Sequence, residues 1–238
     1  DGACPDCGRP LILLQEDAFF FILFTFEQKL LDYIDAHPDF ILPQSRRNEV
    51  VSFIKQGLTD LCISRTSVNW GIPVPDIGLE LEQQHYVYVW FDALLNYLSG
   101  IRYLSDDSFF QQFWPADVHL IGKDILKFHA VIWPAMLMAL EISLPDHVFG
   151  HGFIYQDGEK MSKSKGNVLD PYVIKETFGV DAFRYYLARE IVFGLDGTYS
   201  EEKMNQRYNS DLANDYGNLL NRTLNMMKKY FNLTIPEF

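Results

Sequence analysis

Apolar side chains recur every three or four residues in two stretches near the start of the chain. The first runs from Phe26 to Ile34 and predicts a helix that ends before Pro38. The second runs from Ser45 to Gly57, where Ser45 suits an N-terminal cap and Gly57 suits a helix end. We expect two helices that pack on each other and carry no catalytic chemistry.

Three later runs are rich in aromatic and β-branched residues, which is typical of buried strands. They span residues 86–91, 118–121 and 148–155. Helical patterns follow the first two runs, after Asp92 and from Asp124. Strands that alternate with helices indicate a parallel sheet, and ligands of such sheets bind at the carboxyl ends of the strands. The pattern therefore predicts an α/β fold with a ligand crevice where these runs end.

From Pro171 onward the pattern is helical, and Ser200 is expected to cap a long last helix. The composition of the 238 residues is 48% apolar and 22% charged, which is typical of a globular protein. No apolar run approaches the ~18 uncharged residues of a membrane span. The three cysteines argue against a disulfide framework and fit a reducing cytoplasm.

A net charge of −12 argues against general adhesion to nucleic acid but leaves room for a local anion site. Such a site is suggested by "DGEKMSKSKGN", residues 157–167, which sets three lysines between Gly158 and Gly166. A cationic loop of this kind can close on a polyphosphate and stabilise charge that develops during transfer. Spacing alone leaves the alternative of a solvated charged loop open.

Near the N-terminus, Cys4 and Cys7 are separated by two residues and followed by Gly8. A structural zinc site needs four ligands, and this pair supplies two. The residues are compatible with half of a zinc knuckle or with a turn that carries two free thiols.

The string "KMSKS" at residues 160–164 is the second signature of class I aminoacyl-tRNA synthetases. Together with "VYVWFDALLNYLSG", "HLIGKDILKFHAVIWPA", "HGFIYQDGEKMSKSKGNV" and "NDYGNLLNRT", it resembles the methionyl-tRNA synthetase family along nearly the whole chain. The resemblance implies a ligase that joins methionine to ATP as methionyl-adenylate, with Mg²⁺, and passes it to methionine tRNA for translation. It also makes Cys4 and Cys7 half of the family's structural Zn²⁺ knuckle.

The resemblance assigns roles at the nucleotide and amino-acid sites. The residues that match the family's phosphate contacts are Lys160 and Lys163, of which Lys163 also counts among the ATP contacts. The other matches to the ATP site are Gly122, Asp124, His151 and Gly152. The matches to the methionine pocket are Trp90, Tyr97, Ile125 and His129. Aromatic and weakly polar side chains suit a soft thioether, although each of the pocket residues taken singly is also compatible with core packing.

On the last helix, Asn218 and Arg222 match positions with which the family reads the tRNA anticodon. They are four residues apart and so share one helix face, and Asn and Arg suit base edges. The alternative is an ordinary solvated face.

The implied fold is the second half of a split Rossmann-like catalytic domain with a parallel sheet. The expected segments are 1–86 from a connective insertion with a zinc-knuckle remnant, 87–153 from the catalytic domain, 154–215 for the KMSKS domain and 216–238 for the start of a helical anticodon-binding bundle. The first class I signature, His-x-Gly-His, does not occur in the sequence. We therefore expect this chain alone to be inactive.

Two other functions stay open. The first is a class I synthetase for leucine, valine, isoleucine or cysteine, against which the set of Trp90, Tyr97 and His129 argues. The second is a tRNA-binding relative without catalysis, against which the intact lysine signature argues. The apolar stretch from Phe24 to Phe26 departs from the usual family text, which often has Ser-Lys-Tyr there.

Overall fold

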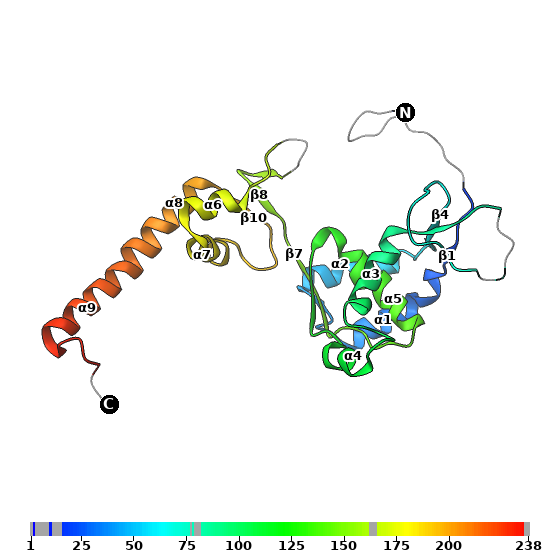
Figure 1. Cartoon of the computed structure of the whole chain (residues 1–238), viewed down its shortest axis with the longest axis horizontal. Coiled ribbons are helices and arrows are strands. Elements are labelled where there is room, and N and C mark those ends of the chain that lie inside the picture. The colour runs from blue at the N-terminus through cyan, green and yellow to red at the C-terminus, as the bar shows by residue number, and fades with distance from the viewer. Residues whose placement is uncertain are drawn as a thin grey trace. The chain divides into compact units, whose positions relative to one another are not determined.

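Two compact units, Asp1–Phe149 and Gly150–Phe238, make up the chain in this computed structural model (Figure 1). The structure describes residues 2, 10, 16–76, 78, 82–161 and 166–235. The division into four segments that the resemblance implies stays a prediction. Within the described ranges, every helix is too short or too polar to cross a membrane.

The first unit mixes short strands with helices. Its elements are, in order, β1 (Phe20–Phe21), the 3-10 helix η1 (Leu23–Phe26), α1 (Glu27–Ala36), β2 (Ile41–Leu42), α2 (Gln44–Lys55), β3 (Leu61–Cys62), β4 (Ser64–Arg65), β5 (Tyr86–Val87), α3 (Val89–Ser99), α4 (Asp107–Phe113), β6 (Val118–Gly122), the 3-10 turn η2 (Lys123–Ile125), the π-helix η3 (Phe128–Ile132), α5 (Trp133–Ala139) and β7 (His147–His151).

The main sheet of this unit has the order β2-β7-β6. Strands β2 and β7 pair in parallel, with Ile41 opposite Val148, which confirms an α/β fold with a parallel strand pair. The helix predicted first is also confirmed, because α1 ends at Ala36, before Pro38. The cap predicted at Ser45 is wrong. The N-cap of helix α2 is Pro43, two residues earlier, and the Pro43 carbonyl accepts from the amides of Arg46 and Arg47.

The prediction of a buried parallel strand over residues 86–91 is wrong. Only Tyr86 and Val87 form a strand, and that strand pairs antiparallel with β4. Helix α3 already starts at Val89, rather than after Asp92, and turns Leu94 and Leu98 into the core. A short run that is apolar on all sides suits either a strand or a buried helix, so its composition cannot decide between them.

The single strand predicted over residues 148–155 is interrupted. Strand β7 ends at His151, and β8 (Ile154–Gln156) pairs instead with β10 (Gly197–Tyr199). The break occurs at Gly152, where an added Cβ would lie 2.3 Å from the carbonyl carbon of Leu195. Such a close approach of two backbones leaves room for glycine alone.

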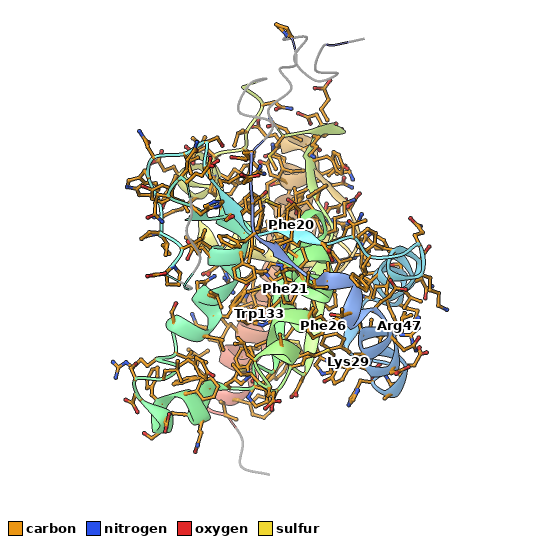
Figure 2. The ribbon with its side chains drawn as sticks, turned by 90° about the vertical axis from the view of Figure 1, so that its right-hand side faces the viewer. Phe20, Phe21, Phe26, Lys29, Arg47 and Trp133 are labelled. Carbon is orange, nitrogen blue, oxygen red and sulfur yellow. The ribbon has the colours of Figure 1, made fainter. Side chains whose placement is uncertain are left out.

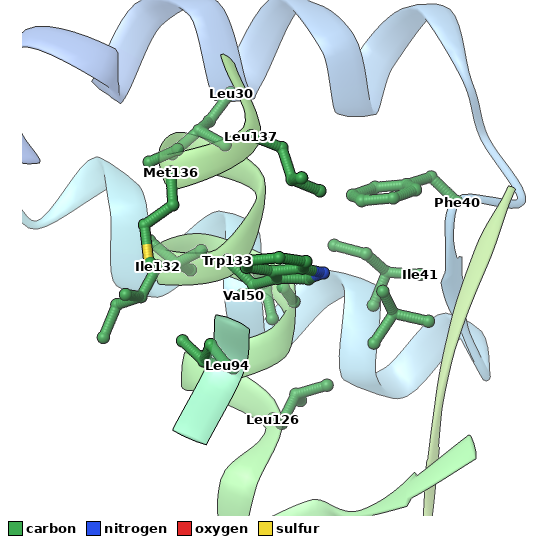
Figure 3. Close-up of a cluster of buried hydrophobic side chains, with 14 of the residues drawn as sticks. Leu30, Phe40, Ile41, Val50, Leu94, Leu126, Ile132, Trp133, Met136 and Leu137 are labelled. Atoms are coloured by element: carbon green, nitrogen blue, oxygen red, sulfur yellow. The ribbon is translucent and has the colours of Figure 1, made fainter. Parts of the chain in front are cut away.

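Trp133 lies at the centre of the first unit's core (Figure 3). Its side chain is fully buried in one cluster with side chains from the helices and the main sheet, among them Leu30, Phe40, Ile41, Val50, Leu94, Leu126 and Leu137. These contacts join α1, α2, α3 and α5 to the sheet. Burial of this many large apolar side chains is the main stabilising term for the unit.

The aromatic residues around Phe24–Phe26, where the sequence differs from the usual family text, are half-buried or exposed. Phe21 and Phe26 stack with ring centroids 5.4 Å apart, and the Lys29 ammonium lies 5.5 Å from the Phe26 centroid (Figure 2). By contrast, Phe20 is 53% exposed and Phe24 is 55% exposed. Nothing in the structure explains why these two positions are aromatic.

The second unit continues with β8, β9 (Glu159–Lys160), α6 (Pro171–Phe178), α7 (Val180–Glu190), β10, α8 (Glu201–Arg207), the π-helix η4 (Tyr208–Tyr216) and α9 (Gly217–Phe231). Its sheet has the order β10-β8-β9. Helix α8 is capped as predicted, because the Ser200 hydroxyl accepts from the Lys203 amide at 3.2 Å. The Glu190 carboxylate on α7 accepts from Lys203 at 2.8 Å and from Arg207 at 3.0 Å, which ties α7 to α8.

We expect Leu137→Ala to lower the free energy of unfolding by about 2–5 kcal/mol, because it empties space in a fully buried part of the core. Leu140→Ala, which makes the same change at a 48% exposed position beside the end of α5, should lower it by only about 0.5 kcal/mol. Urea unfolding of the two variants measures both values. Equal losses would contradict this description of the core.

Candidate active site

The Tyr97 hydroxyl and the His129 imidazole form a hydrogen bond of 2.8 Å between α3 and the π-helix η3. The other imidazole nitrogen, Nδ1, lies 3.0 Å from the Ile125 carbonyl oxygen. A carbonyl can only accept, so Nδ1 carries the proton and Nε2 accepts from the Tyr97 hydroxyl. Burial lowers the pKa of His129, which keeps the ring neutral, and burial raises the pKa of Tyr97.

Trp90 reaches the same helix by another contact. It lies two turns before Tyr97 on α3 and stacks on Phe128, with ring centroids 4.0 Å apart and planes 15° apart. Phe128 precedes His129 on η3. The structure thus connects the four residues predicted for a methionine pocket through α3 and residues 125–129. A π-helix is rare and is often found at a functional site, because its wider turn redirects side chains.

His119 and Trp133 extend this cluster, and neither was predicted as part of a site. The His119 ring lies 4.2 Å from the Tyr97 ring, and its Nε2 accepts from Trp133 Nε1 at 3.2 Å. Burial, helped by the neighbouring His129, lowers the pKa of His119 to about 4. The sequence carries no signal for it: on β6 the buried positions are His119 and Ile121, whereas the apolar neighbours Val118 and Leu120 are exposed.

Gly122 is the last residue of β6 and Asp124 lies two residues further on, so both are at the carboxyl end of this strand, where the sequence predicts a ligand. Gly122 has φ −69° and ψ 146°, an extended conformation open to any residue. Asp124 is exposed on the 3-10 turn η2, whose last residue is Ile125. The candidate ribose contact and the candidate methionine pocket therefore share one turn of the first unit.

The other predicted nucleotide contacts lie in the second unit. His151 is exposed, and its Nδ1 donates to the Gly152 carbonyl at 2.8 Å. Both residues line a cavity of about 570 Å³. Most of its other lining residues come from the end of α7 and the loop before β10, including Leu187, Arg189, Ile191, Val192 and Leu195.

Lys160 was expected on a loop, but it lies on strand β9 opposite Tyr155. A turn at Asp157 and Gly158, with φ values of 48° and 84°, folds β9 back on β8. The Lys160 ammonium lies 4.8 Å from the Phe153 ring centroid, so the strand holds it in an exposed position. Lys163 lies outside the described residues.

Cys4 and Cys7 also lie outside the described residues. In the part of the chain that the structure describes, no three His, Cys, Asp or Glu side chains are grouped to hold a metal ion. Asn218 and Arg222 are exposed on α9, one turn apart on the same face.

The family model described as tRNA synthetases class I (M) matches residues 1–224. The chain therefore belongs to this family of class I tRNA synthetases. It is 54% identical to the methionine–tRNA ligase of Caldanaerobacter subterraneus subsp. tengcongensis over 238 residues, which are 100% of this chain and 36% of that protein. It is 56% identical to the methionine–tRNA ligase of Fusobacterium nucleatum subsp. nucleatum, over 98% of this chain and 36% of that protein.

Solved structures agree with this assignment. The Mycobacterium tuberculosis methionyl-tRNA synthetase in complex with methionyl-adenylate matches with a TM-score of 0.87 and 48% identity, over 99% of this chain and 46% of that one. The free form of the M. tuberculosis enzyme matches with a TM-score of 0.84 and 45% identity, over 99% of this chain and 45% of that one. The chain thus has the fold of the matching part of these synthetases and spans about a third of the length of its curated relatives.

We expect the free energy of unfolding to fall as pH drops from about 6.5 toward 4. His119 and His129 have lowered pKa values in the fold, so the unfolded chain takes up protons that the fold excludes. Their contribution is complete above pH ~6.5 and is lost below it. Carboxylates lose their contribution to stability only at lower pH. An example is Glu16, whose pKa is lowered to about 2 by hydrogen bonds from Arg65, Ser67 and Thr66.

Urea unfolding at pH 7, 6 and 5 tests this dependence. His119→Gln removes one of the two titrating groups, so its stability should vary less with pH over this range. An equal pH dependence in the variant and the original chain would exclude His119 as a source.

Proposed function

We propose that this chain is part of an enzyme that activates methionine with ATP and transfers it to methionine tRNA. The hydrogen bond between Tyr97 and His129, set among aromatic rings, carries this proposal. It gives a neutral, largely apolar site with two polar atoms, which suits a thioether side chain. The methionyl-adenylate in the M. tuberculosis relative supports the same ligand for this chain.

In the first step, a carboxylate oxygen of methionine attacks the α-phosphorus of ATP, and the bond to pyrophosphate breaks. Positioning and charge stabilisation supply most of the catalysis in such a transfer. Lys160 and Lys163 would neutralise the phosphates, and Asp124 would accept a hydrogen bond from the ribose. Gly122, His151 and Gly152 would contact the rest of the nucleotide. In the second step, a terminal ribose hydroxyl of the tRNA attacks the methionyl carbonyl carbon and AMP leaves.

Two metal ions belong to the proposal. Mg²⁺ would accompany ATP and be held mainly by its phosphates, because the described residues offer no cluster of carboxylates. Zn²⁺ would be bound by Cys4 and Cys7 together with two further ligands, and it would have a structural role. Asn218 and Arg222 would contact unpaired anticodon bases from the exposed face of α9. A cytoplasmic location remains a prediction.

The pocket would recognise methionine by its sulfur as well as by its size. An apolar pocket separates side chains that differ by one methylene by only ~1–3 kcal/mol. In the structure the Tyr97 O–H donates to His129 Nε2, so a contact with the sulfur would need this hydroxyl to turn toward the thioether. The hydroxyl and the His129 ring would then make weak polar contacts that a purely aliphatic side chain cannot make. These contacts favour methionine over leucine, isoleucine and valine.

Exchange of pyrophosphate into ATP tests the proposal directly. The full-length protein that carries this sequence should show exchange with methionine and not with leucine, isoleucine, valine or cysteine. The 238-residue chain alone should show none, because it lacks the His-x-Gly-His signature. Exchange with another amino acid would support a class I synthetase but contradict the assignment of the methionine pocket. No exchange with any amino acid would favour a tRNA-binding protein without catalysis.

Tyr97→Phe should raise the KM for methionine about tenfold in the same assay, since it removes the contact of the hydroxyl to sulfur, and tenfold corresponds to ~1.4 kcal/mol. It should also reduce the preference for methionine over norleucine, in which a methylene replaces the sulfur. Tyr103→Phe, a matched change at a half-buried tyrosine that packs on Phe110, should leave both values unchanged. An unaltered norleucine preference in Tyr97→Phe would rule out the sulfur contact.

A further inference from the structure

His119 is a buried histidine beside the candidate methionine pocket, and it contacts both Tyr97 and Trp133. Its side chain is 5% exposed. Tyr97 packs against one part of the ring, at 4.2 Å between centroids, and the indole N–H of Trp133 donates to Nε2 at 3.2 Å. Strand β6, helix α3 and helix α5 therefore meet at this one imidazole.

The hydrogen bond from Trp133 fixes the chemical form of His119. An indole N–H can only donate, so Nε2 must present a lone pair and Nδ1 must carry the single ring proton. An imidazolium would lose this acceptor and would bring a charge near His129, whose ring centroid is 6.3 Å away. The buried site therefore holds a neutral ring in one tautomer.

Trp133 is a rigid anchor for this ring. It is fully buried at the centre of the core (Figure 3) and directly follows the π-helix that carries His129. Tyr97 packs against both histidines, and its ring meets the His129 ring at 74° with centroids 5.6 Å apart. His119 thus contacts one partner of the Tyr97–His129 bond directly and is tied through Trp133 to the helix of the other.

We propose that His119 is a positioning residue for methionine recognition, which holds the Tyr97 ring where its hydroxyl meets His129. This inference rests on the proposed function. Without an acceptor at the Nε2 position, the buried Trp133 N–H would have no partner, and the rings of Trp133 and Tyr97 would shift to find one. A shift of about 1 Å in the hydroxyl is enough to weaken recognition at a site of this kind.

Two amide variants distinguish the effect of the hydrogen-bond acceptor at Nε2 from the effect of losing the imidazole ring. In His119→Gln the amide oxygen reaches the position of Nε2 and can accept from Trp133. In His119→Asn the shorter side chain places its oxygen near Nδ1, so the acceptor is lost. The assay is methionine-dependent pyrophosphate exchange by the full-length protein, with KM for methionine, KM for ATP and kcat measured separately.

We expect His119→Asn to raise the KM for methionine about tenfold, as Tyr97→Phe does, because a displaced Tyr97 hydroxyl no longer meets its partners. KM for ATP and kcat should stay within about twofold, and His119→Gln should restore the KM for methionine to within about threefold of the original. His37→Asn, at an exposed histidine, should change nothing. Because His119 acts through Tyr97, adding His119→Asn to Tyr97→Phe should raise the KM little further.

Three results would overturn the proposal. The KM for methionine could be unchanged in His119→Asn, or it could rise equally in His119→Asn and His119→Gln. In the double variant, its rise could equal the product of the rises in His119→Asn and Tyr97→Phe. A parallel change of all three kinetic parameters would indicate a general structural role and would also overturn it. Failure of the proposed function is a different result, since the unmodified protein would then show no exchange with methionine.

Discussion

The fold of the first unit depends on how it buries the indole of Trp133. The aromatic ring supplies apolar surface to the core, but its N–H loses solvent and needs an acceptor inside the protein. His119 provides that acceptor, which requires a neutral imidazole with its lone pair on Nε2. The same imidazole packs on Tyr97. The residue that satisfies the buried indole of the core therefore also contacts a side chain of the candidate pocket.

Local signals predicted local structure well. The helical spacing before Pro38 and the cap at Ser200 are both confirmed, because each depends on residues within one or two turns. The predicted cap at Ser45 is wrong for a local reason as well, since the preceding proline carbonyl takes its place. Predicted helix boundaries commonly differ from the observed ones by one or two residues, as they do here.

Long-range contacts explain the larger differences. The run at residues 86–91 is strand-like in composition, but most of it is helix, because its later residues belong to a helix that packs into the core. The run at 148–155 divides at Gly152 because a backbone more than 40 residues later in the chain lies against it. Neither the partner strand nor the approaching backbone can be identified from the local pattern. Periodicity alone could therefore predict an α/β fold without its strand order.

The candidate site shows the same limit. Family motifs predicted Trp90, Tyr97, Ile125 and His129 as pocket residues. In the structure Tyr97 and Ile125 contact His129, and Trp90 stacks on the adjacent Phe128. The motifs did not single out His119, because its contact with the site depends on a hydrogen bond from Trp133, fourteen positions away in the sequence. The strand position of Lys160 was open to prediction, since Asp-Gly between two short strands is a strong signal for a tight hairpin.

The Tyr97–His129 pair and Lys160 lie in opposite environments, and the proposed chemistry uses each for a different ligand group. A thioether has no charge, so its recognition depends on weak polar contacts that water would otherwise replace; the neutral Tyr97–His129 pair is accordingly buried or half-buried. A triphosphate needs strong positive charge that stays hydrated until the ligand arrives, and Lys160 is accordingly exposed on a hairpin strand. Burial of a lysine among the aromatic rings would lower its pKa, and exposure of the histidines would allow them to protonate. Separate elements for the two tasks let each side chain keep the protonation state that its ligand requires.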